Sequence, residues 1–404
     1  MWAVYAAFGL LVASTGALVP LIQPDLGLTD GEMGLVLGAW QLLFIGSSIP
    51  AGRIIDRFGI RRALLGSMVV MLASGLGRAV AHDFVTLFAA VALFGVGAPI
   101  VSTGAPKVAA SLFDGSRRRT AVAVYSTAPG IGGVLGLVLP TNVIGPLVGQ
   151  DWRSVMVVIT AVAAVGLVMW AVASRGLDSV MAPGGGPDLS QYRAIARTPV
   201  VRFVLALSIV NFFTVHGVGQ WIVAILTDAG WTSQEAGLWA AFGTAGGLVA
   251  SFVLPRAASS RLRPHLMVGS LVLGAGSLFF LQSTSVAVLV PAVLVAMMAR
   301  SALMPLFSLT LMDHPDVGPE KIAAATGLFF TMAQIGGVAG PAATGFLSDR
   351  TGGFTVPLLV HSGLMLGIAA AIGVGYRRAL AGPGPTHQTP PAAISISPTG
   401  GQRR

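Results

Sequence analysis

Apolar residues run in long stretches along the whole chain, and short polar segments separate them. A helix crosses the hydrocarbon layer of a bilayer with about 20 mostly apolar residues. The stretches have this length and do not alternate as barrel strands do, so they predict membrane-spanning helices. We predict twelve, at residues 1–22, 32–55, 63–81, 84–110, 120–141, 154–173, 201–227, 235–254, 266–282, 286–312, 322–347 and 355–376.

Composition agrees with this pattern. Apolar residues make up 54% of the 404 residues, and the mean hydropathy is +0.82. The chain is therefore predicted to be an all-α membrane protein in a lipid bilayer. The absence of cysteine excludes disulfides and thiol chemistry. The first segment lacks a basic leader and is not expected to be a signal peptide.

The longest polar connection divides the segments into six and six. It contains the run PGGGP, which no helix is expected to cross. The predicted parts are an N-terminal six-helix bundle at 1–173, a cytoplasmic linker at 174–200, a C-terminal six-helix bundle at 201–378 and a tail at 379–404. The tail is rich in proline and glycine, and we expect it to be disordered.

Charge is distributed unevenly over the predicted loops. With the N-terminus inside, only Arg78, Arg153 and Arg350 of the 24 lysines and arginines fall outside, and Arg300 falls within a segment. Such a bias toward inner loops orients membrane proteins. The net charge of +9 could suggest a nucleic-acid partner, but its uneven distribution instead predicts both termini in the cytoplasm, a location in the cytoplasmic membrane and no nucleic-acid partner.

The stretch GRIIDRFGIRR, residues 52–62, is the most charged interruption. The inward charge bias explains its arginines but not Asp56 or the two glycines. Glycine permits a tight turn at Gly59 and close approach of a helix at Gly52. Its charged residues are Arg53, Asp56, Arg57, Arg61 and Arg62.

Two glycine-dense segments, each with one proline, occupy corresponding places in the two halves. They are STAPGIGGVLG at 126–136 and QIGGVAGPAATG at 334–345. Small residues allow close helix packing in lipid, and proline bends a spanning helix. Matching positions favour a duplicated transporter over generic small-residue packing.

With these motifs the chain resembles the major facilitator superfamily up to about residue 378. The stretch 52–62 is similar to the family loop G-x-x-x-D-R-x-G-R-R, although Ile60 replaces a basic residue. The segment 126–136 is similar to the G-P-x-x-G-G motif of exporters and antiporters, with Ala128 in place of its first glycine. The positions that this assigns to a conformational gate are Gly52, Asp56, Arg57, Gly59, Arg61 and Arg62.

The resemblance implies twelve helices in two pseudo-symmetric six-helix bundles, the major facilitator fold. It also implies alternating access, in which the two halves rock around a central site. Asp56 would contact a neighbouring helix end and basic residues when the cytoplasmic side is closed. The residues expected to bend helices are Pro129, Gly132, Gly133, Gly340 and Pro341. We expect a monomer.

Ionisable residues inside the predicted helices are candidates for the central site. All 15 acidic residues fall in loops or at helix mouths, whereas Arg300 lies at the middle of its segment. A charge at that depth is costly unless it faces a wet cavity or a partner. The guanidinium fork fits carboxylates, so a transported anion is one candidate partner; helix carbonyls and water are the alternative.

His216 and Gln220 share one helical face, and His216 also lies near mid-depth. Histidine titrates near physiological pH, so His216 is the candidate for coupling transport to a proton. The polar groups of both halves either contact substrate or hydrogen-bond neighbouring helices. The substrate-binding candidates are Arg300, His216, Gln220, Gln41, Tyr125, Trp40, Trp221 and Asn211, with Gln334 as a weaker one.

Two further basic residues have local explanations. Arg78 is expected to pair with His82 and Asp83 at the outer interface. Lys107 lies near the inner end of its segment, where its amine reaches the interface or lines a gate.

These features predict a secondary transporter of a small anionic solute. The alternative is efflux of neutral or amphiphilic compounds, including drugs. An enzyme is not expected, because H-E-x-x-H, a buried acid pair and cysteine are all missing. No metal site and no cofactor are predicted.

Overall fold

The computed structural model describes residues 1–176, 189–259, 261–314, 317 and 322–379. These residues form helices and short connections, without strands. The centre of the predicted linker and almost all of the predicted tail lie outside the described residues.

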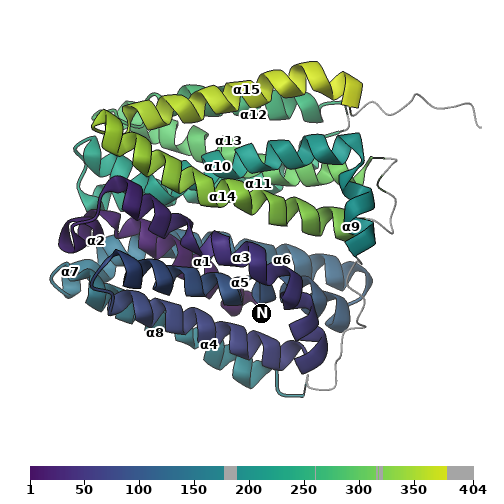
Figure 1. The fold of residues 1–404 in the computed structure, drawn as a ribbon, viewed down its shortest axis with the longest axis horizontal. Helices are drawn as coiled ribbons and strands as arrows, with labels where there is room; N and C mark the ends of the chain where they lie inside the picture. Colours follow the sequence, from purple (N-terminus) through teal and green to yellow (C-terminus); the bar gives the residue numbers. More distant parts are fainter. Residues whose placement is uncertain (177–188, 260, 315–316, 318–321, 380–404) are drawn as a thin grey trace, which may run out of the picture.

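The helices form two bundles that lie side by side (Figure 1). The N-terminal bundle consists of α1 (Trp2–Ala17), α2 (Val19–Leu26), α3 (Asp30–Phe58), α4 (Ile60–Ala79), α5 (Phe84–Leu112), α6 (Gly115–Val138), the π-helical turn η1 (Leu139–Ile144), α7 (Gly145–Leu147) and α8 (Trp152–Ala173). The C-terminal bundle consists of α10 (Pro199–Asp228), α11 (Ser233–Ala257), α12 (Arg263–Leu278), α13 (Val286–Met312), α14 (Ile322–Thr351) and α15 (Thr355–Ala379). The short helix α9 (Leu189–Ala196) precedes α10.

The predicted all-α fold is confirmed. Among the described residues, nine helices are long and apolar enough to cross a bilayer, and α1 with α2 makes a tenth. Together with α12 and α14, these helices correspond to the twelve predicted segments. The first segment differs because it is bent by 56° between α1 and α2. Pro20 causes the break, since its ring clashes with the preceding turn and it has no N–H to donate.

Helix starts repeat between the bundles. Thr29 and Glu32 form a reciprocal capping box at the start of α3, and Thr232 and Glu235 form the same box at the start of α11. Each box satisfies backbone N–H groups that a helix start leaves without partners. The two helices are the second spans of their bundles, so this repeat supports the two-fold organisation.

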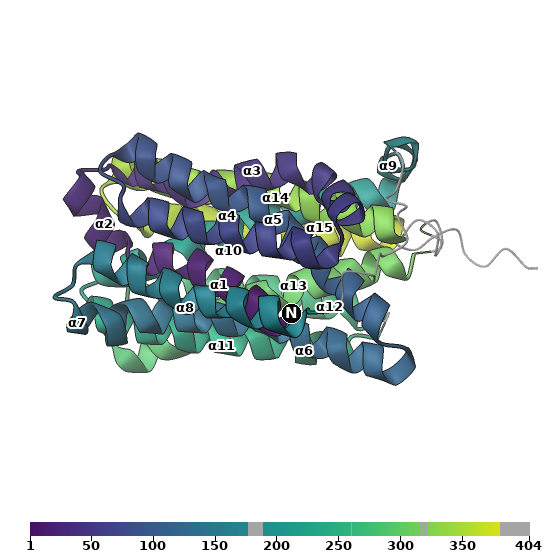
Figure 2. The same cartoon turned by 90° about the horizontal axis from the view of Figure 1, so that it is seen from below.

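The ends of the long helices form two faces. The face that contains α9 and the connections near Gly59, Asp114 and Ala258 is called the basic face. The opposite face, which contains α2 and α7, is called the acidic face. In Figure 1 the basic face lies at the right and the acidic face at the left. Figure 2 shows the same two ends after a quarter turn.

The bundles touch on the acidic face. Asp349 at the end of α14 accepts hydrogen bonds from the backbone N–H groups of Asp30 and Gly31 at the start of α3, both at 2.8 Å. A Cβ placed on Gly34 would overlap the carbonyl oxygen of Pro341, so α3 and α14 approach backbone to backbone. The carboxylate also faces the positive end of the α3 dipole. The two bundles are therefore in direct contact on the acidic face, through α3 and α14.

On the basic face no hydrogen bond joins the two bundles among the described residues. Every hydrogen bond between the bundles that joins described residues lies at mid-depth or on the acidic face. On the basic half of α3, Ile49 is 62% exposed, and nothing lies within 4 Å of a Cβ built on Gly52. The close helix approach predicted at Gly52 is thus not present in this conformation.

Candidate functional site

At mid-depth, three polar side chains meet where the bundles join. Gln41 of α3 lies 3.3 Å through its Nε2 from Nδ1 of His216 of α10. A Cβ built on Gly337 of α14 would lie 3.1 Å from Gln41, 3.2 Å from Gln334 Oε1 and 3.4 Å from His216. Gly337 therefore leaves space for the three side chains, which we call the seam cluster: Gln41, His216 and Gln334.

The seam cluster has unused hydrogen-bonding capacity. Gln41 Oε1, Gln334 Oε1 and the neighbouring Trp40 Nε1 are buried and have no partner among the described residues. A buried polar atom without a partner costs about 1–3 kcal/mol. One donor and two acceptors of the seam cluster and its neighbour Trp40 thus remain without a hydrogen-bond partner among the described residues.

An aromatic wall leads from the seam cluster into the N-terminal bundle. The Trp40 ring lies 6.0 Å from His216 and 5.8 Å from Phe8, in both cases edge to face. Phe8 lies 5.6 Å from Tyr5, which stacks on Tyr125 at 6.4 Å. Trp40 and Tyr125, which sequence predicted as site residues, are therefore connected through Tyr5 and Phe8. These two were not predicted, because an aromatic residue in an apolar segment carries no signal of its position.

Arg300 lies behind the seam cluster. It is 2% exposed, and it donates to the carbonyl oxygens of Ala296 at 3.0 Å and Thr214 at 3.4 Å, with Met297 Sδ at 3.0 Å. Thr214 precedes His216 by two residues on α10, so one helix separates the guanidinium from the cluster. In this conformation helix carbonyls hold Arg300, which is the second of the environments that the sequence left open.

Arg78 occupies a similar position in the other bundle. It is 2% exposed and donates to the Leu11 carbonyl oxygen at 2.8 Å and to Thr15 Oγ1 at 2.7 Å. Its guanidinium lies 5.5 Å from the Phe94 ring. The predicted pair with Asp83 is wrong, since that carboxylate caps α5. The Arg78 side chain instead points into the bundle, because α1 provides carbonyl and hydroxyl acceptors there. The position of α1 beside Arg78 could not be predicted from the sequence.

The other predicted site residues of α10 lie elsewhere. Trp221 is fully buried and donates to the Pro341 carbonyl oxygen at 3.0 Å within the C-terminal bundle. The backbone carbonyl of Gln220 faces Gly16 of α1. Asn211 is buried with both side-chain polar atoms unpartnered among the described residues. None of the three belongs to the seam cluster.

At the predicted gate, Asp56 has a defined partner. Its carboxylate accepts from Lys107 Nζ of α5 at 2.6 Å, and both side chains are 26% exposed. Gly59 has φ +79°, which fits the predicted tight turn between α3 and α4. Arg57 lies over the Phe58 ring, and the Arg61 carbonyl oxygen accepts from Trp170. The pair ties α3 to α5 within one bundle.

The glycine motifs mark close helix contacts. A Cβ on Gly132 would overlap the carbonyl oxygen of Ala6 on α1, whereas a Cβ on Gly133 would reach only Thr244, at 4.0 Å. In α14, a Cβ on Gly340 would overlap the Phe213 carbonyl oxygen of α10. The two segments thus hold the first and fifth spans of each bundle together.

Comparison with known proteins agrees with this architecture. A sequence profile described as Major Facilitator Superfamily matches residues 1–341. The chain is 23% identical over 386 residues to the hexuronate transporter of Bacillus subtilis, covering 87% of each chain. It is 36% identical over 173 residues to the puromycin resistance protein of Streptomyces alboniger, covering 41% of this chain and 33% of that protein.

The fold also matches a solved structure over most of its length. It is similar to the crystal structure of a bacterial homologue of the human lysosomal transporter Spinster in an inward-facing, unoccupied conformation. The TM-score is 0.73 at 15% identity, covering 94% of this chain and 96% of that chain. Because the profile covers most of the chain and the fold is shared, the protein belongs to the Major Facilitator Superfamily of membrane transporters.

Proposed function

We propose that the protein is a secondary transporter that moves a small organic anion across the cytoplasmic membrane by alternating access. The excess of Lys and Arg on the basic face supports a cytoplasmic position for that face. The structure then corresponds to the state that is open to the cytoplasm and closed outside. The seam cluster and the aromatic wall form the substrate site of this proposal.

Two of the buried arginines carry the proposal. Arg78 and Arg300 lie one in each bundle, and neither has a carboxylate partner among the described residues. Arginine stays protonated in proteins, so both contribute positive potential where the dielectric constant is low. Arg300 lies behind His216, and Arg78 lies behind Phe94, which packs against Trp40 at 5.9 Å. An anion at the seam would neutralise this potential.

The relatives support two substrate classes. A hexuronate has a carboxylate and hydroxyl groups. The free indole N–H at the seam can donate to the carboxylate, and the free amide oxygens can accept from the hydroxyl groups. The partial similarity to a puromycin resistance protein and the aromatic wall favour the second candidate, efflux of amphiphilic compounds.

Solute counterflow in proteoliposomes tests the anion proposal. Liposomes preloaded with glucuronate are expected to take up labelled glucuronate faster than empty ones, and benzoate and benzyl alcohol extend the panel as a charged and a neutral aromatic. Glucose serves as the neutral sugar for comparison. We expect exchange with at least one anion and none with glucose or benzyl alcohol, because only an anion neutralises the buried charges of Arg78 and Arg300. Uptake with and without a pH gradient tests proton coupling, for which His216 is the candidate.

The outcome separates the two candidates. Protein-free liposomes give the background rate. If neutral amphiphiles exchange and no anion of the panel does, the anion proposal is wrong and the efflux alternative stands.

Replacing Asp56 with asparagine is expected to lower the turnover rate about tenfold while changing substrate affinity less than twofold. The substitution breaks the ion pair with Lys107, which lies on the basic half and away from the seam cluster. Turnover measured by counterflow and affinity measured by ligand titration of purified protein distinguish the two effects.

The double variant Asp56→Asn with Lys107→Met provides the control. Two residues that act through one interaction are not additive, so the double variant should turn over no more slowly than Asp56→Asn alone. Loss of binding in Asp56→Asn with normal turnover per bound substrate would show that Asp56 belongs to the substrate site and not to a gate.

A further inference from the structure

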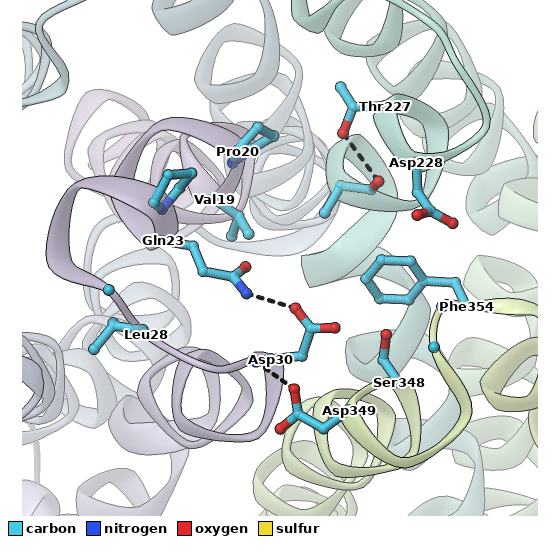
Figure 3. A pocket seen from close by; sticks show the side chains of 15 residues that line it. Val19, Pro20, Gln23, Leu28, Asp30, Thr227, Asp228, Ser348, Asp349 and Phe354 are labelled. Carbon is cyan, nitrogen blue, oxygen red and sulfur yellow. Dashed lines mark hydrogen bonds between the residues drawn. The ribbon is translucent and has the colours of Figure 1, made fainter.

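A cavity lies on the acidic face, at the junction of the bundles and away from the seam cluster (Figure 3). Its volume is about 610 Å³. The helix α2 and the start of α3 line one side, and the ends of α10 and α14 with the connection to α15 line the other. The size is that of a small-molecule site, which typically occupies about 300–1,000 Å³.

The cavity collects negative charge from both bundles. Asp30, Asp228 and Asp349 line it, and no basic side chain is among its lining residues. Asp349 uses both oxygens on the backbone of α3. Asp30 accepts one hydrogen bond from Gln23 at 2.5 Å, and Asp228 accepts one from Gln282 at 3.1 Å. Asp30 and Asp228 each keep a second oxygen without a hydrogen bond from the described residues.

Ser348 points to a ligand independently of these acids. It is 1% exposed, and its hydroxyl has no hydrogen-bond partner among the described residues. In Figure 3 the hydroxyl extends from α14 into the space between Asp30 and Phe354. Burying a hydroxyl without a partner is unfavourable, so the site is complete only when a bound group satisfies it.

We propose that this cavity binds a small organic ammonium ion. The ammonium group would donate to the free oxygens of Asp30 and Asp228 and to Ser348 Oγ, and the alkyl part would lie against the Phe354 ring. An ammonium group forms charge-assisted hydrogen bonds with carboxylates, and an apolar alkyl chain packs favourably on an aromatic ring. A metal ion fits less well, because no three His, Asp or Glu side chains among the described residues are placed to hold one.

Binding of n-butylammonium to the purified full-length protein tests the proposal, with n-butanol as the neutral probe of equal length. Butylammonium is expected to raise the thermal unfolding temperature saturably, and butanol is not. Asp228→Asn should weaken butylammonium binding about tenfold or more, since it removes a charge-assisted hydrogen bond. Ser348→Ala should weaken it several-fold.

Glu32→Gln is the matched control. It removes a charge from the same face, but Glu32 does not line the cavity, and glutamine preserves the capping box with Thr29. Its dissociation constant should stay within about twofold of the unmodified protein, because screening by salt weakens distant surface charges.

Three results would overturn the proposal. They are no saturable effect of butylammonium, an equal loss in Glu32→Gln and Asp228→Asn, and a larger stabilisation by Ca²⁺ or Mg²⁺ than by the ammonium probe. The assay needs no transported solute, so its outcome is independent of the anion proposal for the seam cluster.

Discussion

Replacing Gly132 with alanine is expected to cost the N-terminal bundle roughly 1–3 kcal/mol or more in free energy of unfolding. The added methyl group would overlap the carbonyl oxygen of Ala6, which is backbone and cannot rotate away. The helices α1 and α6 must therefore separate, and they lose packing along their whole contact. In lipid this packing is the main force that holds helices together, since the surrounding chains are as apolar as leucine.

The neighbouring glycine provides the control for this prediction. A methyl group on Gly133 meets only Thr244, at ordinary contact distance, so Gly133→Ala should leave stability nearly unchanged. Thermal unfolding of both variants in the same detergent, followed by size-exclusion chromatography, measures the difference. Equal unfolding temperatures for Gly132→Ala and Gly133→Ala would contradict the close α1–α6 contact.

Replacing Arg300 with methionine is expected to lower the affinity for a transported anion more than tenfold. The guanidinium has no carboxylate partner among the described residues and lies one helix behind the seam cluster. Charges in a low-dielectric interior are only weakly screened, so removing this one lowers the attraction for an anion at the seam. Methionine fills similar space without the charge, so the loss reports electrostatics more than packing.

Two further variants separate charge from structure. Arg300→Lys keeps the charge and should retain most of the affinity, whereas Arg350→Met removes an exposed charge on the acidic face and should have little effect. Dissociation constants from ligand titration, with unfolding temperatures to confirm folding, give the comparison. If Arg300→Met leaves the affinity of every transported anion unchanged, Arg300 serves packing alone.

Local features of the sequence were sufficient for the spans and several of their boundaries. The predicted segment 286–312 coincides with α13 because its length and composition fit one crossing. Gly59 adopts the positive φ that its place in a tight turn predicted. The capping boxes of Thr29 with Glu32 and of Thr232 with Glu235 were not predicted, although each depends only on residues three apart.

Partners between distant segments were not predictable in this way. The sequence placed Arg78 beside Asp83, yet its guanidinium donates to α1, and Lys107 pairs with Asp56 across 51 positions of the chain. Gln334 ranked below Gln220 as a site residue, although Gln334 lies in the seam cluster and Gln220 does not. Which polar side chains meet depends on the helix that each face contacts, and one sequence does not contain that information.

By itself the sequence determined an all-helical membrane protein in two halves, because hydrophobic length and charge bias act locally on each segment. Only the tertiary structure decided that Gln41, His216 and Gln334 meet at mid-depth, that Arg78 and Arg300 bind helix carbonyls, and that three carboxylates gather on the acidic face. These contacts depend on how the two bundles pack against each other, and backbone approach at glycines such as Gly34 sets that packing.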